Sequence, residues 1–238
     1  MFAVIRIPDF SLASILWREE NSPPPPRAVA VRANRKSIVA CVDDEARKCG
    51  VAPGMATARA LARCAELSIL AENPSAEASA MEWLIALGFG VSPRVEATIP
   101  GQVTVDLRGV RDLSKIAGLL NDRADRVGMP IRVGISDTPE RAEWASWHPS
   151  GHCHAIRDEE LFEGVSPGEL PLPPMIRQHL EEWGIRSLFS FVRLSKEDVE
   201  RRLGPEGGLF WERMKGRRAR LLEVVEDPPS FYRDVELE

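Results

Sequence analysis

The chain has 238 residues, of which 44% are hydrophobic and 28% charged, and its formal net charge is −5. These values are typical of a soluble globular protein with one large or two small domains. No apolar run approaches the roughly 18 residues of a membrane span and no cationic segment precedes an apolar one at the N-terminus, so we expect a cytoplasmic protein with no membrane partner.

The first part of the chain alternates short apolar runs with helical patterns. In chain order, the pattern predicts a strand over 2–7, a helix capped by Asp9 and reaching about residue 20, strands over 27–33 and 37–42, and short helices over 45–49 and 55–64. Asp43 is placed to cap the helix at 45–49, and Gly50 to end it. A proline run at 23–26 predicts a stiff extended loop after the first helix.

Residues 94–99 and 102–107 each alternate apolar and polar side chains, which is typical of half-buried strands. Between them, Pro100 fixes φ at the first central position of a turn, and Gly101 accepts a positive φ at the second. The two stretches therefore predict a strand pair joined by a tight turn.

Before and after this strand pair, we expect helices over 76–87, 113–127 and 139–147 and a strand over 131–135.

The chain becomes all-helical after a hinge at 167–174. We expect a later helix from Ser195, with stops at Gly204 and Gly216. Residues 180–188 match a helix-hairpin-helix pattern in which Gly184 allows the tight turn. Backbone N–H groups there, next to Arg186 and Ser187, are suited to receive a DNA phosphate without reading its sequence.

Four stretches, at residues 2–14, 46–55, 99–106 and 132–138, resemble the Y-family (UmuC/DinB-like) translesion DNA polymerases in order and spacing. The resemblance implies an α+β fold with an antiparallel mixed sheet. A palm and fingers-like domain would span 1–165, with the small fingers element at about 43–70. A thumb-like, all-helical helix-hairpin-helix domain would span 166–228, and 229–238 would begin a truncated next domain.

The same resemblance indicates which residues stand where active relatives bind metal. The metal-binding carboxylates fall on Ile7, Gly101 and Gln102. Nucleotidyl transfer needs two Mg²⁺ ions held by anionic oxygen ligands, which these three residues cannot supply. We therefore expect no catalytic residue and no cofactor. Asp9 and Asp106 remain as a possible remnant site for one divalent ion, the alternative being a helix cap and a solvated strand end.

Further positions agree with a lost nucleotide site. The tyrosine that touches the triphosphate in relatives falls on Asp44, the phosphate-facing lysine on Glu143, and the aromatic sugar gate on Leu12. Arg47 alone keeps its residue type, for an anion-binding role or a structural ion pair. Two carboxylates in such a pocket would repel a nucleotide.

An Ile-Pro-Asp-Phe motif at 7–10 and a Gly-Ile-Ser-Asp-Thr-Pro segment at 134–139 resemble the ImuB group of non-catalytic Y-family members. That resemblance implies a scaffold in DNA damage tolerance and error-prone translesion synthesis. Its partners would be an error-prone replicative-type polymerase, a recombinase-like mutasome subunit and the sliding clamp.

Two other functions stay open. The chain could be a weakly active or unusual DNA polymerase that binds Mg²⁺ through Asp9, Glu96 and Asp106. It could instead be a sequence-independent DNA-binding module. Basic residues outnumber acidic ones between 177 and 220, so we expect any DNA contact, through Gly184, Arg186, Ser187, Arg217, Arg218 and Arg220, to be weak and confined to the second half.

The segment around His148, His152, Cys153 and His154 has two interpretations. The spacing could form a metal clip, but Pro149 and Gly151 favour a loop with solvated imidazoles.

Overall fold

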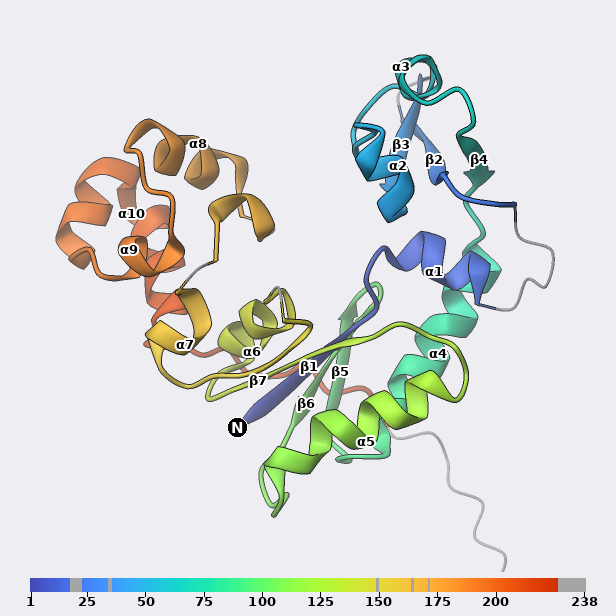
Figure 1. The fold of residues 1–238 in the computed structure, drawn as a ribbon. Coiled ribbons are helices and arrows are strands. Elements are labelled where there is room, and N and C mark those ends of the chain that lie inside the picture. Colours follow the sequence, from blue (N-terminus) through green and yellow to red (C-terminus); the bar gives the residue numbers. More distant parts are fainter. Residues whose placement is uncertain (18–22, 34–35, 149, 164, 171, 227–238) are drawn as a thin grey trace, which may run out of the picture.

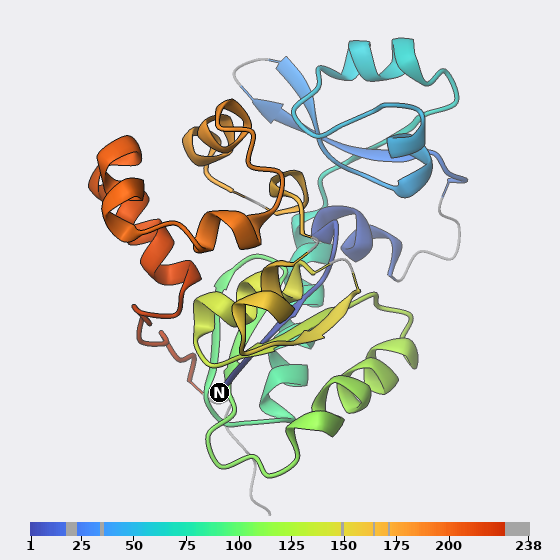
Figure 2. The same ribbon diagram turned by 60° about the vertical axis from the view of Figure 1, so that its left-hand side comes forward.

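The protein consists of a central lobe, a small lobe and a helical lobe, and the small and helical lobes extend from different sides of the central lobe (Figure 1, Figure 2). A computed structural model describes residues 1–17, 23–33, 36–148, 150–163, 165–170 and 172–226. The segment predicted to begin a next domain, 229–238, lies outside these residues. None of the helices in the described ranges is long and apolar enough to cross a membrane.

The central lobe is built on a five-stranded mixed sheet. Its strand order is β5 (Val95–Ile99), β6 (Gln102–Asp106), β1 (Phe2–Arg6), β7 (Arg132–Ser136) and β8 (His152–His154). β1 runs antiparallel to both neighbours, whereas β8 runs parallel to β7. The expected antiparallel mixed sheet is therefore confirmed. The loop expected at 152–154 is wrong, because these residues pair with β7.

Strand alternation gives this sheet two different faces. Ile5, Val103 and Val133 point to one face and form its core with α4 (Pro74–Phe89) and α5 (Leu113–Asp125). The other face is covered by α6 (Pro139–Ser146). Gly134 permits this close approach, since a Cβ there would lie 2.2 Å from the Ala142 carbonyl oxygen.

The small lobe is a three-stranded sheet with two short helices. Its strand order is β3 (Lys36–Val42), β2 (Arg27–Ala33) and β4 (Ser68–Ala71), and its helices are α2 (Asp44–Lys48) and α3 (Thr57–Arg63). Ala28 and Val39 from the strands pack with Ala46 and Ala60 from the helices. The fingers element expected at 43–70 is thus part of a larger unit that includes β2 and β3.

The helical lobe contains the short helix α7 (Asp158–Phe162), the 3₁₀ turn η1 (Pro167–Glu169), α8 (Pro174–Glu182), α9 (Leu188–Val192) and α10 (Lys196–Met214). The helix predicted from Ser195 is α10, and the Ser195 side chain caps it by accepting from Asp198 N–H. Gly204 has φ 70° and breaks α10 into two parts. The two parts pack around a core shared with α8 and α9.

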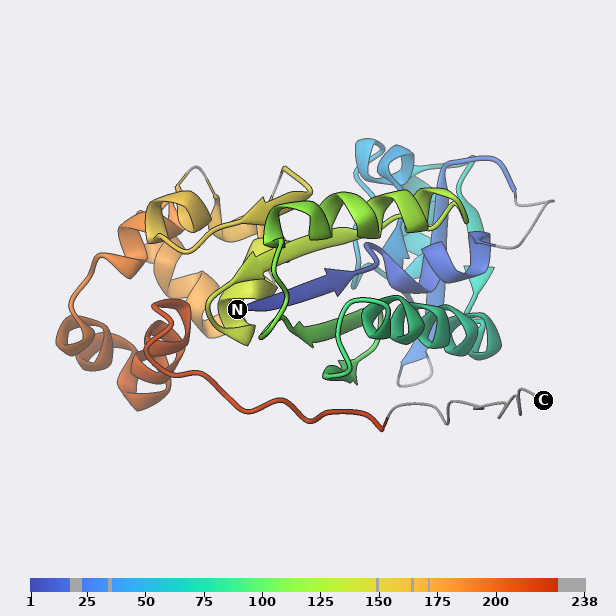
Figure 3. The ribbon, with the colours of Figure 1, turned by 90° about the horizontal axis from the view of Figure 1, so that it is seen from below.

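After the helical lobe, the chain returns along the central sheet. Figure 3 shows this segment running alongside the β5 edge of the sheet. Val225 N–H donates to the Val95 carbonyl at 2.8 Å, and Glu96 forms an isolated antiparallel bridge with Val224. The exposed edge of β5 is therefore partly covered by residues more than a hundred positions later in the chain.

Candidate functional site

The fold brings Ile7, Gly101 and Gln102 together at one end of the central sheet. The register pairs Arg6 with Gln102, and Ile7 N–H donates to the Gly101 carbonyl at 2.8 Å. Ile99 pairs with Gln102, so Pro100 and Gly101 form the predicted two-residue turn. None of the three side chains is anionic, and Ile7 is buried in the apolar core.

Phe10 occupies the space in front of Gly101. Phe10 begins α1 (Phe10–Leu16), the helix predicted after Asp9, and residues 18–20 of the predicted range lie outside the described residues. Gly101 has φ 72°, a conformation that L side chains rarely adopt. A side chain at 101 would therefore meet both backbone strain and the aromatic ring, so the position is closed to an aspartate in this arrangement.

Asp9 and Arg47 form an ion pair that joins the central and small lobes. Asp9 has φ 47°. The prediction that its side chain caps α1 is wrong, because it makes no capping hydrogen bond. Its carboxylate instead accepts from Arg47 Nη2 at 2.5 Å, while Arg47 Nη1 donates to Asp44 at 2.7 Å. Burial lowers the pKa of Arg47, but its bonds to Asp9 and Asp44 outweigh this effect and raise it.

A cleft of about 290 Å³ opens beside this ion pair, between α1 and α2. Its charged lining residues are Asp9, Asp43, Asp44, Arg47 and Arg132. Three carboxylates thus face two guanidinium groups. One of these, Arg47, is already bonded to two of the carboxylates. The cleft therefore offers little free positive charge to a triphosphate.

Asp106 lies at the opposite end of β6 from Gly101. It pairs with Phe2 in the strand register, and its carboxylate is fully buried. Arg108 donates to it from Nε at 2.8 Å, and Arg94 lies 3.1 Å away. Burial raises the pKa of Asp106, but the bonds from Arg108 and the charge of Arg94 lower it further than burial raises it.

Both sequence-based interpretations of Asp106 are therefore wrong. Asp9 follows β1 at the end where Arg6 pairs with Gln102, so Asp9 and Asp106 cannot share one ion. Asp106 is also not solvated. Glu96, the third ligand of the unusual-polymerase hypothesis, is bonded to Arg220. Among the residues that the structure describes, no group of three His, Cys, Asp or Glu side chains could hold a metal, which includes the described part of the segment at 148–154.

Glu143 and Arg6 lie on the face of the sheet that α6 covers. Burial raises the pKa of Glu143, although Arg220 and a hydrogen bond from Gln102 act in the opposite direction. The Arg6 guanidinium stacks 3.6 Å from the Trp147 ring centroid and donates to the Ser146 carbonyl at 3.1 Å. Arg6 was not among the site residues predicted from the sequence. Its signal was a single charged residue inside an otherwise apolar strand.

The candidate DNA-binding residues lie in two places. Gly184 has φ 67° and forms the turn between α8 and α9, with Ile185 N–H bonded to the Leu180 carbonyl at 2.9 Å. Arg186 is exposed beside this turn, and Ser187 stands at the N-cap position of α9.

The second group follows α10 on the returning segment. The Arg217 guanidinium lies 4.7 Å from the Trp211 ring centroid, and Arg218 is exposed. Arg220 is engaged by Glu96 on the central sheet. Arg186 and Arg218 therefore present exposed cationic side chains, whereas Arg220 already has an anionic partner.

A sequence model of the family described as impB/mucB/samB matches residues 19–146. The chain is also 27% identical over 199 residues to proteins named DNA polymerase IV 2 from Mycobacterium tuberculosis and Mycobacterium bovis, covering 76% of this chain and 55% of theirs. It is 26% identical over 142 residues to DNA polymerase IV of Ralstonia nicotianae, and the match covers 57% of this chain and 40% of that protein. The chain thus spans about half the length of these relatives.

Solved structures share the fold. DinB from Sulfolobus solfataricus matches with a TM-score of 0.74 and 16% identity, over 94% of this chain and 70% of that one. An insertion ternary complex of Dbh DNA polymerase matches with a TM-score of 0.75 and 17% identity, over the same shares. The Y-family-like fold predicted from the sequence is confirmed by these matches.

Proposed function

We propose that this chain, which belongs to the impB/mucB/samB family of Y-family (UmuC/DinB-like) DNA polymerases, is a non-catalytic, polymerase-like scaffold in DNA damage tolerance. The observation that carries the proposal is the end of the central sheet at Ile7, Gly101 and Gln102, where none of the three side chains is a carboxylate. Two Mg²⁺ ions need anionic oxygen ligands at short distance. Asp9, the nearest carboxylate in sequence, is bonded to Arg47.

The charge of the adjacent cleft supports the same proposal. A nucleoside triphosphate carries several negative charges, and the cleft lining has one more carboxylate than cations. Glu143, which stands where relatives carry a phosphate-facing lysine, adds an acidic group on the sheet face beside Gln102. Nucleotide binding and metal binding are both disfavoured by the residues present.

Within the family, we place the chain with the ImuB group on the motifs at 7–10 and 134–139. Its partners in this proposal are an error-prone replicative-type polymerase, a recombinase-like mutasome subunit and the sliding clamp. DNA binding is weak and sequence-independent, through the backbone of the turn at Gly184 and the exposed side chains of Arg186 and Arg218. A net charge of −5 for the whole chain limits the affinity.

Primer extension tests the catalytic part of the proposal. The purified protein is incubated with a primed template and all four deoxynucleotides, with Mg²⁺ or Mn²⁺, beside a carboxylate-bearing Y-family polymerase as positive control. We expect no extension with either ion. Extension that is lost in the Asp9→Asn variant would support an unusual polymerase instead, whereas extension that the variant retains would point to a contaminating enzyme.

Fluorescence anisotropy with a labelled primer–template tests the DNA-binding part. Affinity should fall steeply with salt, because each neutralised phosphate releases counterions. Arg186→Ala and Arg218→Ala should each reduce the slope of log K against log salt by about 0.9 for each phosphate that the variant no longer neutralises. Arg126→Ala, at an exposed arginine that caps the C-terminus of α5 in the central lobe, serves as the matched control, with an unchanged slope. An absence of binding at low salt would remove this part of the function.

A further inference from the structure

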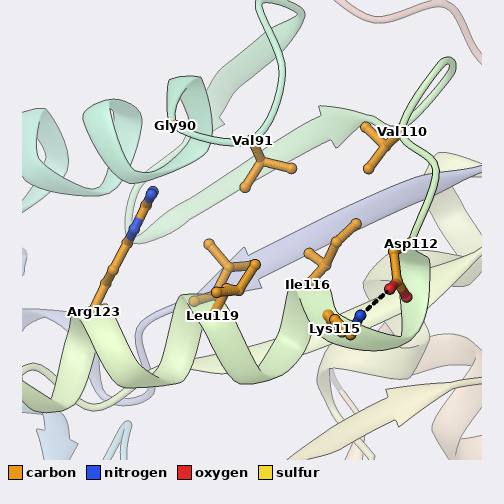
Figure 4. A pocket seen from close by; sticks show the side chains of 9 residues that line it. Gly90, Val91, Val110, Asp112, Lys115, Ile116, Leu119 and Arg123 are labelled. Atoms are coloured by element: carbon orange, nitrogen blue, oxygen red, sulfur yellow. Dashed lines mark ion pairs between the residues drawn. The ribbon is translucent and has the colours of Figure 1, made fainter.

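A groove of about 420 Å³ lies on the face of the central sheet that α4 and α5 cover, between the loop that follows α4 and helix α5 (Figure 4). Val91 and Val110 line one wall, Leu119 lines the other, and the buried Ile116 and Leu120 form the floor. Val110 follows the end of β6 that carries Asp106. The groove is therefore remote from Gly101 and from the cleft beside Arg47.

The groove exposes apolar surface that the fold itself does not use. Ile116 and Leu120 are buried and form its floor, but Leu119 is 58% exposed. Leu119 lies one helical turn from both Lys115 and Arg123, so the three side chains line the same side of α5. Leu119 thus adds an exposed apolar side chain to a groove that Val91 and Val110 also line, and apolar surface gathered in a groove is suited to contact another molecule.

The charged residues that line the groove, Asp112, Lys115 and Arg123, carry one net positive charge. Lys115 is bonded to Asp112 at 2.7 Å, so these two charges offset each other. Arg123 has no ion-pair partner among the residues that the structure describes. Its guanidinium occupies the space above Gly90 at one end of the groove, as Figure 4 shows. The groove thus combines an apolar floor with one unneutralised cation.

We propose that this groove binds a short acidic peptide segment of a partner protein, which places a bulky apolar side chain against Leu119 and a carboxylate on Arg123. The volume suits one large apolar side chain and its neighbours. Complementary charge fixes the direction of the peptide and disfavours basic segments. Because the groove and the cleft are at different ends of the sheet, a partner can bind here while the cleft is occupied.

This proposal rests on the scaffold function, since a scaffold needs a surface that holds a partner away from the DNA. The two are tested separately, because peptide binding is measured without nucleotide or primer. A catalytically active protein that binds the peptide would overturn the scaffold function alone. An inactive protein that does not bind it would overturn the groove assignment alone.

The test uses two fluorescein-labelled synthetic peptides of equal length, one made of alternating aspartate and leucine and one of alternating lysine and leucine. Binding to the full chain is followed by fluorescence anisotropy. We expect saturable binding of the acidic peptide and at least tenfold weaker binding of the basic one. Equal binding of both, or no binding of the acidic peptide, would overturn the proposal.

Three variants locate the site. Leu119→Asp should weaken acidic-peptide binding at least tenfold, and Arg123→Glu should reverse the preference in favour of the basic peptide. Leu61→Asp is the matched control, because Leu61 is a 41% exposed leucine on the surface of α3 in the small lobe, and binding should be unchanged. Circular dichroism confirms that each variant is folded. Binding that survives Leu119→Asp in a folded protein would place the peptide elsewhere.

Two other occupants of the groove, a second copy of the chain and the chain's own terminus, would each give a distinct experimental result. A second copy of the chain would appear in sedimentation as a dimer that Leu119→Asp dissociates. The chain's own terminus would appear as competition, at low concentration, by a free peptide with the sequence of residues 227–238. Either result would overturn the assignment to a separate partner protein.

Discussion

The Nη1 atom of Arg220 donates to both carboxylate oxygens of Glu96, at 2.6 Å each. Glu96 belongs to β5 and its side chain is 3% exposed, whereas Arg220 lies on the segment that returns from the helical lobe. The Arg220 backbone N–H also donates to Glu140 on α6 at 3.2 Å. This arrangement fastens the returning segment to the central sheet and places a cation directly against a buried carboxylate.

Arg220→Ala should therefore lower the free energy of unfolding by roughly 1–3 kcal/mol, because it takes this cation away from a buried carboxylate. Urea denaturation measures the change. Arg218→Ala, at an exposed neighbouring arginine, is the matched control and should change stability by about 0.5 kcal/mol or less. Adding Glu96→Gln to Arg220→Ala should recover part of the loss. Equal losses for the two arginine variants would contradict the interpretation.

Asp158, the first residue of α7 in the helical lobe, bonds to Arg141 on α6 of the central lobe and to Lys215, which follows α10. Burial raises the pKa of Asp158, but these two bonds outweigh burial and lower it below its ordinary value of 3.8. A lowered native pKa means that the stabilisation is complete above about pH 4 and is lost as the pH falls through the native pKa.

Comparing the wild type with Asp158→Asn isolates this contribution from those of other carboxylates. The variant should be less stable at pH 7 by roughly 1–3 kcal/mol. The difference should shrink when urea denaturation is repeated near pH 3, because below about pH 4 the unfolded wild-type chain, in which the pKa of Asp158 is higher, binds a proton more readily than the native protein does. A difference that is constant between pH 7 and pH 3 would mean that the charge of Asp158 does not stabilise the fold.

The elements that the sequence predicts well are those set by local chemistry. The strands at 94–99 and 102–107 follow from a period-two pattern and a Pro-Gly turn, and Asp43 caps its helix as expected. By contrast, β8 is a three-residue polar segment whose strand conformation depends on pairing with β7. A pairing between distant residues leaves no periodic trace in so short a stretch.

The sequence indicates which residues stand at the candidate site, but it does not indicate which ion pairs those residues form. The resemblance located Ile7, Gly101 and Gln102, which the fold places together. It could not show that Asp106 is buried, because the burial of this acid depends on Arg94 and Arg108 folding over it. The cap expected at Asp9 failed for a similar reason, since a partner 38 residues later, Arg47, takes its carboxylate.

Arg47 should bind nucleotide only when its two carboxylate partners are neutralised. Titration calorimetry of the wild type with dATP and Mg²⁺ should show no saturable binding. Asp9→Asn/Asp44→Asn frees the guanidinium and removes two negative charges from the cleft, so weak binding at low salt should appear. Asparagine tolerates the left-handed backbone at position 9. Adding Arg47→Ala should abolish the new binding. Binding that persists without Arg47 would assign it to another cation.

Two glycine variants measure how far Phe10 closes position 101 to a side chain. A Cβ on Gly101 would lie 2.6 Å from Cγ of Phe10, whereas one on Gly109, which also has a positive φ, would meet no atom within 4 Å. Gly109→Ala therefore reports backbone strain alone, about 1 kcal/mol. Gly101→Ala should cost roughly 1–3 kcal/mol more, because the ring must move.

Phe10→Ala provides the space that the new methyl group needs. In the Phe10→Ala background, Gly101→Ala should destabilise the protein no more than Gly109→Ala does, as a double-mutant cycle in urea would show. The same cycle indicates whether an aspartate at position 101 fits only when the Phe10 ring is removed. Ile7→Asp/Gly101→Asp/Gln102→Glu should stay inactive in primer extension while Phe10 is present, because the aspartate at 101 cannot take its place beside the ring. Extension by that triple variant would show that the ring yields easily and that the missing carboxylates alone prevent catalysis.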